Sequence, residues 1–114
     1  MLETSKILAV IPARGGSKGL PHKNILPFMG RPLLHWSIVA AISAGIPRAN
    51  VVLSTDDAKI AAIGEESGAC VPFMRPDYLA QDTTATLPVL QHAIDTVEAE
   101  RGLRFDWVLT LQPT

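Results

Sequence analysis

Short apolar runs rich in Val, Ile and Leu alternate along this chain with segments whose apolar residues recur at helical spacing. The runs cover residues 7–11, 51–54, 69–73 and 105–111, and the helical patterns cover 33–44, a stretch up to about 66, and a segment through 89–97 that ends at Gly102. This alternation is typical of an α/β fold in which helices cover both faces of a mostly parallel sheet. We therefore expect residues 1–114 to form a portion of a single Rossmann-like, three-layer domain, incomplete because no helix follows the last strand.

Two neighbouring acids, Asp56 and Asp57, stand between the second expected strand and the helix after it. Carboxylates at such a junction accept hydrogen bonds from the first N–H groups of the helix and complement its dipole. We therefore interpret Asp56 and Asp57 as capping residues, and contact with a ligand or a metal ion is the alternative.

Cysteine and charge content restrict the classes of protein that the chain can belong to. With Cys70 as its single cysteine, it can form neither an internal disulfide nor a cysteine-based zinc site.

Residues 1–55 carry six Lys and Arg against one acid, which indicates a local anion site. The basic stripe with interleaved aromatic residues that nucleic acid favours is missing. The first apolar run is too short for a signal peptide or a membrane span, so we expect a cytoplasmic protein that binds neither nucleic acid nor membrane.

The stretch after the first expected strand combines three glycines with three cations, namely Gly15, Gly16, Gly19, Arg14, Lys18 and Lys23. The glycines allow backbone N–H groups to approach phosphate oxygens closely. The arginine offers a bidentate guanidinium, and the lysines add compact positive charges. Because open α/β sheets bind ligands beyond the carboxyl ends of their strands, we expect this loop to hold a triphosphate.

Two well-known phosphate-binding motifs do not fit this loop. The dinucleotide pattern GxGxxG needs glycine at its third and sixth positions, where Ser17 and Leu20 stand if Gly15 is the first. The Walker A motif ends in Gly-Lys-Ser/Thr, whereas the order here is Ser17-Lys18-Gly19. The remaining interpretations are a different phosphate-binding loop and a glycine turn with incidental surface cations.

Four motifs, in order, resemble the N-acylneuraminate cytidylyltransferases, also called CMP-sialic acid synthetases. IPARGGSKGLPHKNI at 11–25 is similar to the family pattern (I/V)xARxxSKGLPxKN(I/L), and STDD at 54–57, RPDYLAQDT at 75–83 and LQPT at 111–114 follow. The related Kdo cytidylyltransferases carry ARxxSTRLPxKPL at the first motif, so Lys18, Gly19 and Asn24 match the sialic-acid branch. The resemblance covers nearly the whole chain and corresponds to the N-terminal, nucleotide-binding portion of a nucleotidyltransferase domain.

The resemblance implies that the anomeric hydroxyl of a sialic-acid-like 2-keto sugar acid attacks the α-phosphate of CTP, releasing pyrophosphate and forming a CMP-sugar. It implies catalytic roles for Arg14, Lys18 and Lys23, and contact between Gln112 and the sugar acid. The nucleotide-binding residues that it implies are Ala13, Arg14, Gly15, Gly16, Ser17, Lys18, Lys23, Asn24, Arg75 and Thr86.

The resemblance also implies Mg²⁺ and a homodimer. The aspartates that hold the metal in the family belong to a later segment, so no metal ligand is assigned within residues 1–114. Two alternatives stay open: a related nucleotidyltransferase that acts on Kdo or another sugar, and a non-catalytic module or fragment that binds a nucleotide. The sequence does not choose among neuraminic, legionaminic and pseudaminic acids.

Overall fold

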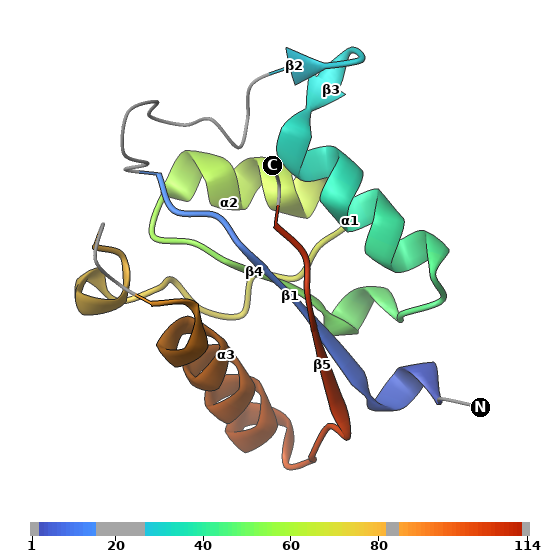
Figure 1. The fold of residues 1–114 in the computed structure, drawn as a ribbon, viewed down its shortest axis with the longest axis vertical. Coiled ribbons are helices and arrows are strands. Elements are labelled where there is room, and N and C mark those ends of the chain that lie inside the picture. The colour runs from blue at the N-terminus through green and yellow to red at the C-terminus, as the bar shows by residue number, and fades with distance from the viewer. Residues whose placement is uncertain (1–2, 16–26, 82–84, 113–114) are drawn as a thin grey trace.

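The computed structural model describes residues 3–15, 27–81 and 85–112. Its central sheet contains the parallel strands β1 (Ile7–Pro12), β4 (Val51–Ser54) and β5 (Trp107–Thr110), and a small antiparallel ribbon contains β2 (Pro27–Phe28) and β3 (Arg31–Pro32) (Figure 1). The helices are α1 (Leu33–Ser43), α2 (Ala58–Glu66) and α3 (Thr86–Arg101), with 3₁₀ turns at Thr4–Lys6, Arg48–Asn50 and Asp77–Leu79. Within these ranges, no helix is long and apolar enough to span a membrane.

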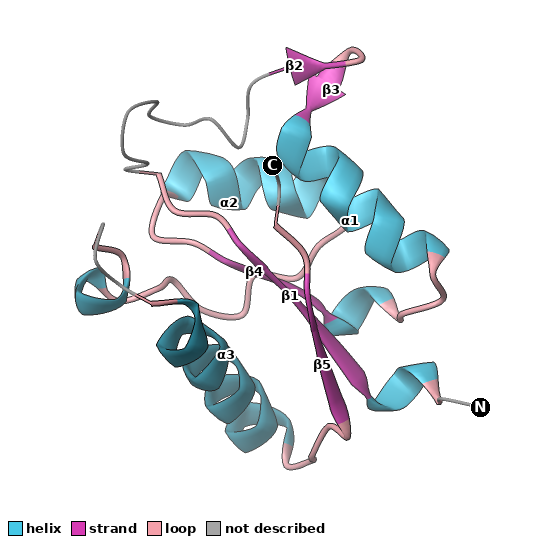
Figure 2. Ribbon diagram, in the orientation of Figure 1, coloured by secondary structure: helices cyan, strands magenta, loops and turns pink. Residues whose placement is uncertain are grey.

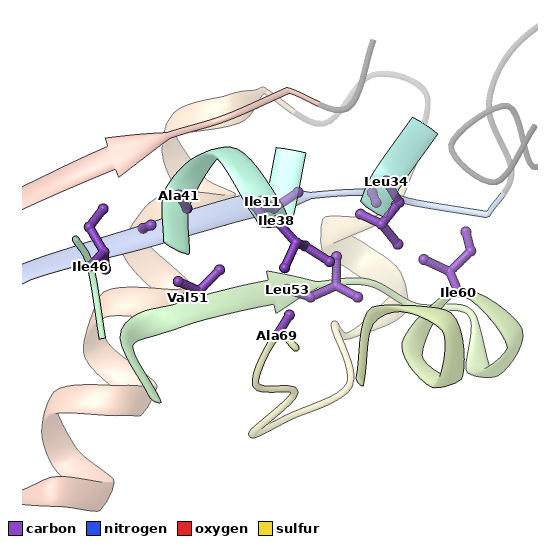
Figure 3. Packing of buried hydrophobic residues seen from close by; sticks show 11 residues of the cluster. Ile11, Leu34, Ile38, Ala41, Ile46, Val51, Leu53, Ile60 and Ala69 are labelled. Carbon is purple, nitrogen blue, oxygen red and sulfur yellow. The ribbon is translucent and has the colours of Figure 1, made fainter. Parts of the chain in front are cut away.

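The helices cover the two faces of the central sheet unequally. Helices α1 and α2 lie on one face and α3 lies on the other (Figure 2). Successive residues of β1 point to opposite faces, so Ile11 packs in a cluster with α1 and α2, where Leu34 and Ile60 are buried (Figure 3). Val10 packs on the other side with Val97 of α3. The three-layer arrangement expected from the sequence is confirmed.

The order of the central sheet is β4-β1-β5, with β1 in the middle. The chain passes from β1 through α1 to β4 on one side, and later from α3 to β5 on the other side of β1. Both pairings are parallel: Pro12 is in register with Ser54, and Val10 with Thr110. The carboxyl ends of all three strands therefore meet at one edge, and the reversal of direction at β1 is where open α/β sheets bind ligands.

Strand β5 is the most exposed part of this sheet. Trp107, Val108 and Leu109 keep 56%, 39% and 40% of their surface accessible, whereas every residue of β4 is buried. In the described residues, β5 is paired with β1 alone and is followed by no helix. The expectation that residues 1–114 form only a portion of a domain stays a prediction.

Most of the elements predicted from the sequence are confirmed to within a few residues, and two differ. The strand predicted over 69–73 is wrong: only Cys70 pairs, in an isolated bridge with Val52, because Pro72 offers no N–H to a ladder. The β2–β3 ribbon was not predicted from the sequence; its turn places Met29 at φ 52° and Gly30 at φ 81°. The available signal was Gly30 at the second position of a two-residue turn, because such hairpin turns favour glycine where φ is positive.

Candidate functional site

The carboxyl edge of the sheet brings together residues that lie far apart in the sequence. Ala13, Arg14 and Gly15 continue from β1, and Gln112 follows β5. Main-chain hydrogen bonds extend the strand pairing to this edge: the Ala13 N–H donates to the Ser54 carbonyl at 3.0 Å, and the Leu111 N–H donates to the Val10 carbonyl at 3.1 Å. The first predicted loop residues and the predicted sugar contact therefore emerge from adjacent strands.

The two acids after β4 have different partners. Oδ1 of Asp57 accepts hydrogen bonds from the N–H groups of Lys59 at 2.8 Å and Ile60 at 3.1 Å, so Asp57 is the N-cap of α2. Oδ1 of Asp56 instead accepts from the Gly15 N–H at 3.0 Å. The capping interpretation is confirmed for Asp57 and wrong for Asp56, because Asp56 faces the end of β1. The sequence carried no signal for that contact, which joins residues 41 positions apart.

Arg75 is buried at this edge, with 6% of its surface exposed. Its Nη2 donates to the Ser54 carbonyl at 2.7 Å, its Nε to Ser54 Oγ at 3.1 Å, and its Nη1 to the Leu79 carbonyl at 3.2 Å. The Arg75 N–H also donates to the Thr55 carbonyl at 2.7 Å. Arg75 therefore joins the end of β4 to the segment 75–79. Its predicted contact with the nucleotide stays a prediction.

The charged groups near Arg75 belong to three different segments. Burial lowers the pKa of Arg75, the Asp56 carboxylate raises it, and the positive charge of Arg14 lowers it. The Arg14 side chain, which is half-buried, and the Asp56 carboxylate thus lie within electrostatic range of the buried guanidinium. The Asp56 carboxylate therefore offsets part of the effect that the Arg14 charge has on Arg75.

The other predicted contacts flank this edge. Thr86 is the first residue of α3 and is exposed. Gln112 is exposed too, and its main-chain carbonyl accepts a hydrogen bond from Ser37 Oγ of α1 at 3.3 Å. This bond ties the chain after β5 to α1. The predicted residues Gly16, Ser17, Lys18, Lys23 and Asn24 lie outside the described residues.

The part of the chain that the structure describes contains no group of three or more His, Cys, Asp or Glu side chains placed to hold a metal ion. Asp56 accepts the Gly15 N–H, and Asp57 caps α2. Metal ligands from beyond residue 114 stay a prediction.

Together, the fold and this edge define an α/β protein with a cation-bearing glycine loop at the point where its strand order reverses. The sequence profile of a family described as cytidylyltransferase matches residues 8–101. The chain belongs to this cytidylyltransferase family, as the motifs predicted.

Two relatives and one solved structure extend this result. The chain is 41% identical over 109 residues to a pseudaminic acid cytidylyltransferase of Campylobacter jejuni, covering 96% of this chain and 46% of that protein. It is 40% identical over 90 residues to an N-acylneuraminate cytidylyltransferase of Escherichia coli, covering 79% of this chain and 21% of the relative. The chain thus spans about half the length of the first relative and about a fifth of the length of the second.

The solved structure is a CMP:2-keto-3-deoxy-manno-octonic acid synthetase complexed with CTP. It superposes with a TM-score of 0.67 at 29% identity, covering 96% of this chain and 40% of that one. The likeness confirms the predicted α/β fold class.

Proposed function

We propose that the protein carrying this chain transfers CMP from CTP to the anomeric hydroxyl of a nonulosonic acid and releases pyrophosphate. The observation that carries the proposal is the point at which the cationic glycine loop begins. It starts at the carboxyl end of β1, beside the end of β5 where Gln112 emerges, so a triphosphate and a sugar acid can be held side by side.

In this reaction the hydroxyl oxygen of the sugar forms a bond to the α-phosphorus of CTP. The bond from that phosphorus to the oxygen bridging to the β-phosphate breaks, pyrophosphate departs, and the hydroxyl proton is lost. The protein's work is to align the two reactants and to neutralise the charge on the transferred and leaving groups. Arg14, Lys18 and Lys23 supply the positive charge, and the loop amides supply donors.

The nature of the sugar rests on the motif and on the relatives. Lys18, Gly19 and Asn24 follow the sialic-acid pattern rather than the Kdo pattern. The two relatives carry the names of pseudaminic and N-acylneuraminic acids, which share a nine-carbon 2-keto acid skeleton. A carboxylate and an anomeric hydroxyl are thus the features that the site has to recognise. Nothing among the described residues favours one nonulosonic acid over another.

Mg²⁺ and a homodimer belong to the proposal as well. A divalent ion bound with CTP would offset part of the triphosphate charge, and its ligands are expected beyond residue 114. Light scattering of the full-length protein measures its oligomeric state, and a chelator titration of activity measures its need for metal.

The test is a substrate panel with the full-length protein. CTP, UTP and GTP are each paired with neuraminic, legionaminic and pseudaminic acids and with Kdo. Pyrophosphate release is followed by a coupled assay, and the nucleotide sugar is identified by ³¹P NMR. We expect product with CTP and one of the nine-carbon acids. Product with Kdo alone would identify the related enzyme class, and CTP binding without turnover would identify a non-catalytic module.

A further inference from the structure

Gly15 lies between the two acids that follow β4. Its N–H donates to Asp56 Oδ1 at 3.0 Å. On the other side, a Cβ added to Gly15 would lie 2.5 Å from Asp57 Oδ2 and 2.8 Å from Asp57 Cβ. Gly15 is also buried. A glycine is therefore required here by lack of space, and not by a left-handed backbone.

Asp57 cannot easily move to make room for a larger residue at position 15. Its Oδ1 accepts the N–H groups of Lys59 and Ile60, which fixes its side chain at the start of α2. Its own N–H donates to Thr55 Oγ1 at 3.1 Å, and Thr55 is fully buried. The wall against Gly15 is thus attached to the core through β4 and α2.

The hydrogen bond from Gly15 to Asp56 falls where the chain after β1 leads into the cationic loop. Two residues earlier, the Ala13 N–H donates to the Ser54 carbonyl, so the chain is attached to the β4 segment at two alternate positions. This second attachment occupies the Gly15 N–H, so phosphate contacts from loop amides have to come from other residues.

We propose that Asp56 is a positioning residue for the cytidylyltransferase reaction: by holding the Gly15 N–H, it sets the direction in which the triphosphate loop leaves β1. It does this without touching the substrate. The inference rests on the proposed function, because it assigns Asp56 to the loop that holds CTP. The role differs from helix capping, which Asp57 performs.

The experiment separates the geometry of Asp56 from its charge in the full-length protein. Asp56→Asn keeps a carbonyl oxygen at the same reach and loses the charge, whereas Asp56→Glu keeps the charge and moves the acceptor by one methylene. If position matters, Asp56→Asn retains a KM for CTP within about twofold of the parent, and Asp56→Glu raises it about tenfold or more. Asp95→Asn, on the exposed face of α3, is the matched control for charge. The reverse ranking, with Glu tolerated and Asn impaired, would overturn the proposal.

Hydrogen–deuterium exchange gives a readout that does not depend on turnover. In short peptides around Gly15, we expect faster exchange in Asp56→Glu and Asp56→Ala than in the parent or in Asp56→Asn, at unchanged thermal midpoint. If the parent protein does not use CTP, the proposed function fails while the exchange data still test the attachment. If the parent turns over CTP and all three variants match it in KM and in exchange, the inference about Asp56 fails alone.

Discussion

The carboxyl edge of the sheet differs on the two sides of β1. On the β4 side, polar groups bond to one another: the Ser54 carbonyl accepts from both Ala13 and Arg75, and Asp56 accepts from Gly15. On the β5 side, a main-chain bond from Leu111 joins the two strands, the Ser37 hydroxyl of α1 donates to the Gln112 carbonyl, and Gln112 is exposed. The polar groups on the β4 side hold the edge together, whereas Gln112 on the β5 side faces solvent.

This difference indicates how a sheet edge can be held in place and still accept a ligand. Buried donors and acceptors are costly unless they are paired, so the side built from buried groups satisfies them internally. Groups that bind a ligand have to be reachable, and those predicted for the sugar acid emerge on the β5 side. Substitutions at five positions test whether the two sides separate stability from substrate binding.

Arg75→Ala should give the largest effect, and this effect should be a loss of stability. It removes three hydrogen bonds from a buried guanidinium, and we expect the free energy of unfolding to fall by about 2–4 kcal/mol. Denaturant unfolding of the full-length protein measures it. Arg104→Ala, at an exposed position, is the control and should change little. A stable Arg75→Ala protein with weakened CTP binding would place Arg75 in the ligand site instead.

Arg14→Ala should act on the substrate more than on the fold. Arg14 is half-buried at the start of the loop, and loss of its charge should lower kcat/KM for CTP about tenfold to a hundredfold. Lys23→Ala should fall in the same range. Lys6→Ala, at the amino end of β1, is a charge-matched control that should keep parent kinetics. Parent kinetics in both loop variants would remove the triphosphate from this loop.

Asp57→Ala should have a smaller effect on stability. It removes the acceptor for two N–H groups at the start of α2, which costs about 1 kcal/mol. Asp57→Asn keeps an acceptor and should lose only a few tenths of a kcal/mol. The thermal unfolding midpoints of the parent and of the two variants measure these losses. If both variants unfold at the midpoint of the parent, the cap contributes nothing measurable to the stability of the β4 side.

Gln112→Ala should have the smallest effect, confined to the sugar acid. Loss of one neutral hydrogen-bonding group from an exposed site should raise the KM for the sugar acid about threefold to tenfold, with the KM for CTP unchanged. Steady-state kinetics with each substrate varied in turn measure both values. A larger change in the KM for CTP would put the nucleotide on the β5 side.

Much of the fold could be predicted because its signals are local. The apolar runs and helical spacings located β1, β4, β5 and all three described α-helices, and Gly102 ends α3 in the left-handed conformation as expected. The strand predicted at 69–73 failed because an apolar run does not reveal that Pro72 interrupts its pairing.

The candidate site divides in the same way. The loop with Arg14 and Gly15 could be found from its composition and motif, since phosphate recognition needs glycines and cations close together in the sequence. The hydrogen bonds on the β4 side of the edge could not be predicted. Arg75 was predicted as a nucleotide contact, and nothing in the sequence indicated its bonds to Ser54 and Leu79.

Local sequence signals were sufficient for the α/β class, for the helix ends near glycines and for the cap at Asp57, and they predicted the loop chemistry, because periodicity and turn preferences act over a few residues. The tertiary structure was needed to show that Asp56 holds Gly15 and that Gln112 emerges beside the end of β1. Those contacts depend on the strand order β4-β1-β5, which brings together residues 41 or more positions apart through packing on both faces of the sheet.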